Sequence, residues 1–137
     1  MTEFPPLTHV ALTVRDLEVS APWYEALLDA RPVIDEDTDP DMHHTVYLLG
    51  NGTLLGLHQH QRPAPPGRFS EFQVGLDHVA FGCANRDQLE KWSRRLDELG
   101  IEHEAEEYRG LPWDKYWIEG GRVYTEVLPF FARRLEW

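Results

Sequence analysis

The sequence is poor in cysteine, in basic residues and in long apolar runs. Among its 137 residues Cys83 is the single cysteine, which excludes an intramolecular disulfide and a zinc cage built of thiolates. Thirteen Lys and Arg stand against 24 Asp and Glu, and the formal charge of -11 repels phosphate backbones and anionic lipid headgroups. No apolar stretch approaches the roughly 20 residues that a membrane-spanning helix needs. We therefore expect neither a nucleic-acid partner nor a membrane partner.

What is present is the composition of one folded domain. Hydrophobic residues make up 42% and charged residues 27%, so a chain of this length can bury a substantial core. The segment after Met1 is acidic and contains proline, and it lacks the basic start and apolar run of an export signal. We expect a single cytoplasmic domain over residues 1–137.

The strongest pattern in the sequence is an internal duplication. Six identities recur at one constant spacing: Leu7/Leu76, His9/His78, Val10/Val79, Ala11/Ala80, Trp23/Trp92 and Leu27/Leu96. Tryptophan and histidine are uncommon, which makes coincidence the weaker explanation. The pattern predicts two similar modules, about 5–62 and about 75–130, joined by a proline-rich linker over 63–74.

Each module is predicted to contain a strand, an amphipathic helix and a hairpin. The first helix is expected to begin at a Ser20 cap, and the second to end at Gly100. Gly50-Asn51-Gly52 predicts the turn of the first hairpin, and Gly120-Gly121 that of the second. A further strand is expected near Val33 or near 101–106, and the acidic stretch 35–41 is interpreted as a solvated loop.

Alternation divides the first strand of each module into two faces. The bulky side chains that should lie under the helix are Val10, Leu12 and Val14 in the first module. The opposite face carries a histidine followed by small residues: His9, Ala11 and Thr13 in the first module, and His78, Ala80 and Gly82 in the second. Small residues beside a histidine predict open volume above the sheet, where a ligand would lie.

Glu126, on the last predicted strand, falls on the histidine side by the same alternation. A carboxylate buried in a sheet is costly unless it is paired or bound to a cation. Taken singly, the alternatives are a hydrogen-bonded core histidine and a solvated glutamate. Two neutral imidazoles and one carboxylate together suit a divalent metal ion such as Fe, Zn, Mn or Ni, with positions left for water or substrate.

These segments resemble the vicinal oxygen chelate superfamily, which includes glyoxalase I, extradiol dioxygenases, and fosfomycin- and bleomycin-resistance proteins. The resemblance rests on the stretches 7–17, 23–28 and 75–81 and on Glu126, and it spans almost the whole chain. It implies an α+β fold, with two tandem βαβββ modules forming a cupped mixed sheet. It also implies metal ligands at His9, His78 and Glu126, with Glu126 as the candidate catalytic residue.

One departure from the family pattern concerns the last strand of the first module. Glyoxalase-like isomerases place a Glu or Gln ligand there, whereas this chain reads Leu55-Gly56-Leu57-His58-Gln59-His60. Gly56, His58 and His60 share a face by alternation. His58 is slightly favoured as a fourth ligand, His60 stays open for that role, and the alternative for both is an exposed position at a strand end.

The resemblance leaves two functions open. The first is a metal-dependent lyase, isomerase or dioxygenase that acts on a small oxygenated molecule chelated through its oxygens. The second is a metal-free, bleomycin-resistance-like protein that sequesters a small compound, cationic compounds included, because the chain is acidic and rich in aromatic residues. In both cases the partner is a small molecule, and the resemblance implies a homodimer.

Overall fold

A computed structural model describes residues 3–50, 52–66, 72, 74–76, 80–83, 86–101, 107–108, 111–112 and 123–126. The chain divides into two compact units, Met1–Gly67 with Leu135–Trp137, and Arg68–Arg134.

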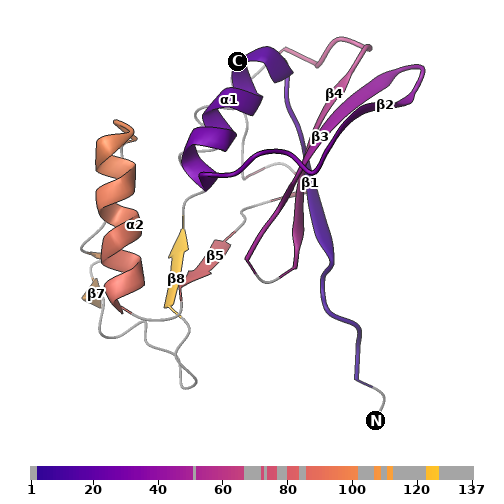
Figure 1. The fold of residues 1–137 in the computed structure, drawn as a ribbon. Coiled ribbons are helices and arrows are strands. Elements are labelled where there is room, and N and C mark those ends of the chain that lie inside the picture. Colours follow the sequence, from indigo (N-terminus) through magenta and orange to yellow (C-terminus); the bar gives the residue numbers. More distant parts are fainter. Residues whose placement is uncertain are drawn as a thin grey trace. The chain divides into compact units, whose positions relative to one another are not determined.

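The first unit is a four-stranded mixed sheet with one helix (Figure 1). Its elements along the chain are β1 (His9–Thr13), α1 (Leu17–Leu28), β2 (Ile34–Asp39), β3 (Met42–Leu48) and β4 (Leu54–His60). The strand order is β1-β4-β3-β2, with β1 parallel to β4 and the other pairs antiparallel. This βαβββ order confirms the α+β class and the strand that was expected near Val33.

Helix α1 begins at Leu17, so the prediction of a Ser20 cap was wrong. Asp16 is the N-cap, and its Oδ1 accepts a hydrogen bond of 2.9 Å from the backbone N–H of Glu18. The N–H of Leu17 donates to Gln59 Oε1 on β4 at 2.6 Å. Asp16 is a local start signal of the kind that helices prefer, Gln59 adds an acceptor from a distant strand, and Ser20 is buried inside the helix.

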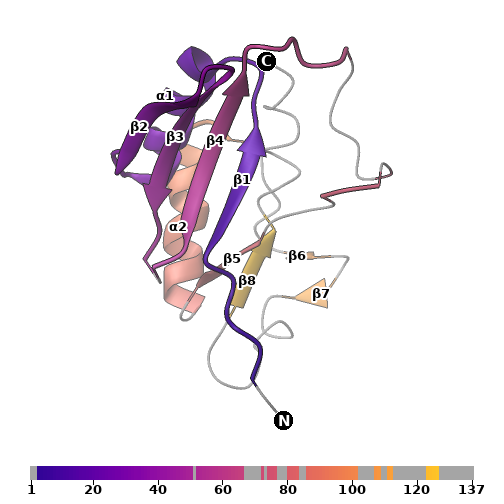
Figure 2. The same cartoon turned by 90° about the vertical axis from the view of Figure 1, so that its right-hand side faces the viewer.

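The core of the first unit lies between α1 and one face of the sheet (Figure 2). Tyr47, Leu55 and Leu57 are its largest fully buried side chains, and the Tyr47 hydroxyl donates to the carbonyl of Ala21 in α1 at 3.4 Å. Leu12 of β1 and Val14, just after the strand, are buried as well, at 5% and 2% exposure. The prediction that the bulky face of this strand is the covered one is therefore confirmed.

The loops of the first unit match the predictions in one case and contradict them in the other. The Gly50–Gly52 turn is confirmed, because Leu49 N–H donates to Thr53 at 2.8 Å and Gly52 has a φ of 85°, a value that favours glycine. The acidic stretch is not a loop, because strand β2 continues to Asp39. Its pairing with β3 begins with Val33 N–H donating to Val46 at 2.8 Å and outweighs the low strand propensity of aspartate.

The second unit contains β5 (Ala80–Cys83), α2 (Arg86–Glu98), β6 (Glu107–Tyr108), β7 (Leu111–Pro112) and β8 (Val123–Glu126). Helix α2 contacts both β5 and β8, and the φ of 66° at Gly100 confirms the expected end of the helix. The described elements repeat the β-α-β-β-β order of the first unit. The β5–β8 pair is antiparallel, however, whereas the β1–β4 pair is parallel. The predicted Gly120-Gly121 turn lies outside the described residues.

Candidate functional site

The candidate site is built on the face of the first sheet that α1 does not cover. On β1, His9, Ala11 and Thr13 are exposed, whereas Leu12 between them is buried. This alternation is the one predicted from the sequence. The strand pairing extends the open face to β4, because Ala11 pairs with Gly56 and Thr13 pairs with His58. The two described candidate ligands, His9 and His58, therefore lie on the same face.

Gly56 makes room for the imidazole of His58. A Cβ at position 56 would lie 3.3 Å from His58 Nε2 and 3.6 Å from the Cβ of Ala11. The ring of His58 thus leans back along β4 over the glycine and toward Ala11, which lies between His9 and Thr13 on β1. The room over Gly56 is therefore occupied by the His58 ring, while Ala11 and Thr13 on β1 are exposed.

His58 is held in an environment that favours its neutral form. Partial burial is the main cause that lowers the pKa of its imidazole below 6.5, and the nearby imidazoles of His44, His60 and His9 lower it further. A neutral imidazole is the form that donates a lone pair to a metal ion. His60, the alternative to His58, is exposed at the last position of β4.

The structure adds His44 to this face, a residue that the sequence reasoning missed. His44 pairs with His58 across β3 and β4, and their ring centroids are 5.5 Å apart. Its Nε2 is buried without a hydrogen-bond partner and lies 3.6 Å from Glu36 Oε1 on β2. The signal was available, because counting back from the Gly50–Gly52 turn pairs residue 44 with residue 58.

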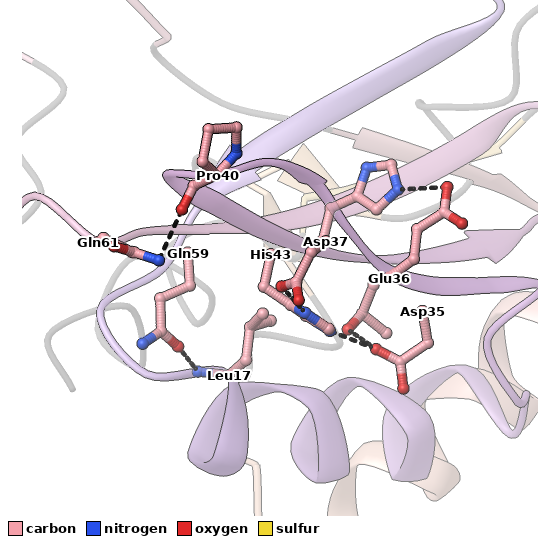
Figure 3. Close-up of polar contacts among 10 residues, drawn as sticks. Leu17, Asp35, Glu36, Asp37, Pro40, His43, Gln59 and Gln61 are labelled. Atoms are coloured by element: carbon pink, nitrogen blue, oxygen red, sulfur yellow. Dashed lines mark hydrogen bonds and ion pairs between the residues drawn. The ribbon is translucent and has the colours of Figure 1, made fainter.

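The neighbouring histidine, His43, points to the opposite face (Figure 3). Its Nε2 lies 2.7 Å from Asp35 Oδ1 and its Nδ1 lies 2.8 Å from Asp37 Oδ1. The hydrogen bond to Asp35, followed by the one to Asp37, raises the pKa of His43, and the bond to His43 lowers the pKa of Asp35. The Thr45 hydroxyl also donates to Asp35 at 3.2 Å. This cluster joins β2 to β3 and lies away from the candidate site.

In the second unit, the strand pairing gives the position of Glu126 relative to β5. Its backbone pairs with Ala80 of β5, and directly paired residues of neighbouring strands share a face. His78 lies outside the described residues, as does the side chain of Glu126. Within the part of the chain whose side chains are described, no group of three or more His, Cys, Asp and Glu is arranged to hold a metal ion.

Comparison with known proteins settles the family. Residues 7–119 match the Glyoxalase/Bleomycin resistance protein/Dioxygenase superfamily. The chain belongs to this superfamily. The relatives of the chain in the superfamily include the metallothiol transferase FosB of Bacillus licheniformis, which is 26% identical over 95 residues. That match covers 69% of this chain and 54% of FosB, so the chain spans about half the length of this curated relative.

Solved structures show the same superfamily fold. A glyoxylase/bleomycin resistance protein/dioxygenase domain from Frankia sp. EAN1pec has a TM-score of 0.71 at 24% identity, covering 90% of this chain and 98% of that one. A variant of the fosfomycin resistance protein FosX from Listeria monocytogenes has a TM-score of 0.57 at 15% identity, covering 90% and 93%. That FosX is in complex with Mn(II) and 1S,2S-dihydroxypropylphosphonic acid. In the described part of our chain, no helix is long and apolar enough to cross a membrane.

Proposed function

We propose that this chain is a metal-dependent enzyme of the superfamily that acts on a small oxygenated molecule. The observation that carries the proposal is the open face of the first sheet, where His9 and His58 share one side with the small residues Ala11 and Gly56. Two imidazoles on an exposed sheet face with small neighbours are suited to a bound ion and a small ligand. The relatives support this choice, because FosB is named a metallothiol transferase and a FosX structure contains Mn(II).

The proposed ligands are His9, His58, His78 and Glu126, two from each sequence module. In the first unit, the histidine nitrogens suit a metal ion. Thr8 Oγ1 lies 3.3 Å from His9 Nδ1, which leaves Nε2 of that ring for an ion. His58 is kept neutral where the family often has a carboxylate or amide ligand. The pairing of Glu126 with Ala80 supports its place on the same face as the residues that follow His78.

The bound ion would supply Lewis acidity that stabilises negative charge on a substrate oxygen. The residues of the chain have separate tasks in the proposal. Glu126 is the proposed proton acceptor. His58 is proposed as a ligand that helps to orient the site and does not take up that proton. Ala11 is small and exposed, which leaves room for a substrate on this face. Because the relatives include fosfomycin resistance proteins, fosfomycin is the first substrate to test, with and without a thiol.

Metal analysis of the purified protein tests the proposal. Protein prepared without added ions should contain roughly one divalent ion per chain, and His9→Ala and Glu126→Ala should each lower that content strongly. His43→Ala is the matched control, because His43 lies on the opposite face of the sheet. Metal content that neither His9→Ala nor Glu126→Ala changes would rule the proposed ligand set out.

The second candidate function is metal-free sequestration of a small compound. The net charge of -11 favours it, because an acidic protein attracts cationic ligands. Calorimetry with bleomycin separates the two functions. Tight binding that a chelator leaves unchanged supports sequestration, whereas binding that is lost with the metal, or no binding at all, counts against it.

A further inference from the structure

Four side chains form one continuous row across the open face of the first sheet. Thr13 on β1 pairs with His58 on β4, and His58 pairs with His44 on β3. His44 in turn pairs with Glu36 on β2. Residues paired directly across strands share a face, so the row crosses all four strands of the sheet and ends at its β2 edge.

Along this row, the side chains of His58 and His44 lie close together, whereas the side chain of Glu36 is largely exposed. The rings of His58 and His44 are 5.5 Å apart between centroids and tilted by 55°. His44 has a side chain only 16% exposed, whereas that of Glu36 is 63% exposed. The 3.6 Å between His44 Nε2 and Glu36 Oε1 is the only polar approach that the structure describes for this buried nitrogen.

His58 is therefore confined on two sides. Toward Ala11, its ring lies over Gly56, where there is room for hydrogen but not comfortably for a methyl group. Toward β2, the ring of His44 limits its rotation. An imidazole confined in this way loses little further freedom when it binds an ion, and the groups that orient a ligating histidine contribute to metal affinity.

We propose that Glu36 and His44 are positioning residues for His58, with Glu36 acting through His44. This inference rests on the proposed function, in which His58 is a metal ligand. The carboxylate of Glu36 holds the His44 ring in its orientation, and the His44 ring holds that of His58. Neither Glu36 nor His44 touches the ion or the substrate in this scheme.

A double-mutant cycle tests whether Glu36 acts through His44. The quantity compared is the Mn²⁺ affinity, measured by calorimetry at one fixed pH. Glu36→Ala should weaken Mn²⁺ binding by about tenfold, and Glu36→Gln, which keeps the shape of the side chain, should weaken it less. In a His44→Ala background, Glu36→Ala should have no further effect. His43→Ala is the control on the opposite face and should leave the affinity unchanged. An effect of Glu36→Ala that is equal in both backgrounds, or absent in both, overturns the inference.

A measurement on the metal-free protein separates this inference from the proposed function. The ring ¹H shifts of His58, which depend on how its ring lies against the ring of His44, should change in Glu36→Ala only when His44 is present. If the wild-type protein binds no Mn²⁺, the proposed function fails, and these shifts alone decide the positioning roles. If His44→Ala does not fold, Glu36→Ala and Glu36→Gln still test the inference, because Glu36 is exposed and makes no described contact with His58. Unchanged His58 shifts in both Glu36 variants overturn the inference.

Discussion

At the scale of single residues, the open face depends on side chains that are small as much as on those that carry chemistry. Gly56 has no unusual backbone conformation, and its importance lies in the volume it leaves to His58. His43 and His44 are adjacent in sequence, yet one belongs to an exposed ion-pair cluster and the other to the candidate site. Alternation along β3 separates their roles.

We predict that Gly56→Ala disturbs metal binding more than it disturbs folding. The added methyl group would lie 3.3 Å from His58 Nε2, so the ring must shift by a few tenths of an ångström. Mn²⁺ affinity should fall about tenfold while the melting temperature changes little. Gly50→Ala is the control, because a Cβ at that turn position meets nothing within 4 Å. Equal affinity in the two variants would contradict the role given to this space.

The His43 cluster should contribute to stability in a defined pH window. The raised pKa of His43 means that its contribution is present below its ordinary pKa of 6.5 and is lost as the pH rises through the raised value. The lowered pKa of Asp35 means that its contribution is present above 3.8 and is lost as the pH falls through the lowered value. The combined contribution should therefore be largest between pH 3.8 and 6.5.

Urea unfolding of His43→Gln tests this window. Relative to wild type, the variant should lose stability near about pH 5.5 and little near about pH 9, and the loss should stay under about 1 kcal/mol because the pair is exposed. In an Asp35→Asn, Asp37→Asn background, His43→Gln should show no such pH dependence. A loss that is larger at the higher pH would have the wrong sign.

At the scale of elements, a local cap together with a tertiary contact sets the start of α1, and pairing with β3 makes β2 a strand. The start of α1 is held by Asp16 and by Gln59, a residue of β4. Strand β2 exists although its sequence is acidic, because its backbone pairs with β3 and two of its aspartates bind His43. Local propensity favoured a loop at 35–41, whereas the start of α1 was marked locally by Asp16.

We predict that Asp16→Ala lowers the free energy of unfolding by about 1 kcal/mol. The change removes the carboxylate that accepts from the Glu18 N–H at 2.9 Å. Asp16→Asn keeps an acceptor at the same place and should retain most of the stability. Denaturant unfolding of the three proteins provides the measurement, and equal stability of the alanine variant and wild type would show that the cap contributes nothing.

At the scale of the whole molecule, the proposed ligands come from two sequence modules that share one ancestral pattern. His9 corresponds to His78 in the duplication, whereas the stretch 55–60 at the end of the first module contains no carboxylate that could correspond to Glu126. The two modules therefore differ in the acidic residue that the proposed site takes from the second. Most soluble oligomers are homo-oligomers, and among them twofold-symmetric dimers are the commonest.

We predict a homodimer in solution, and light scattering should give the mass of a dimer. Co-expression of His9→Ala with Glu126→Ala, each defective alone, then tells whether the His9 and Glu126 of one site come from one chain or from two. Recovered metal binding places them on different chains, because one of the two sites in each mixed dimer is then intact. No recovery in mixed dimers would assign all ligands to one chain, and a monomeric mass would remove the prediction altogether.

Local sequence determined the two faces of β1, the turn at Gly50–Gly52 and the end of α2 at Gly100, because each depends on side-chain period or on backbone freedom within a few residues. It also determined the superfamily, since the motifs around His9 and His78 lie on matching positions of a duplicated pattern.

Tertiary structure decided which residues stand beside one another. Strand register places His44 and Glu36 in line with His58, and Gln59 supplies an acceptor at the start of α1. These pairings join residues that are far apart in the chain, so their free energy appears only when the sheet has assembled. Periodicity assigns each side chain to a face, but only the assembled sheet assigns it a neighbour.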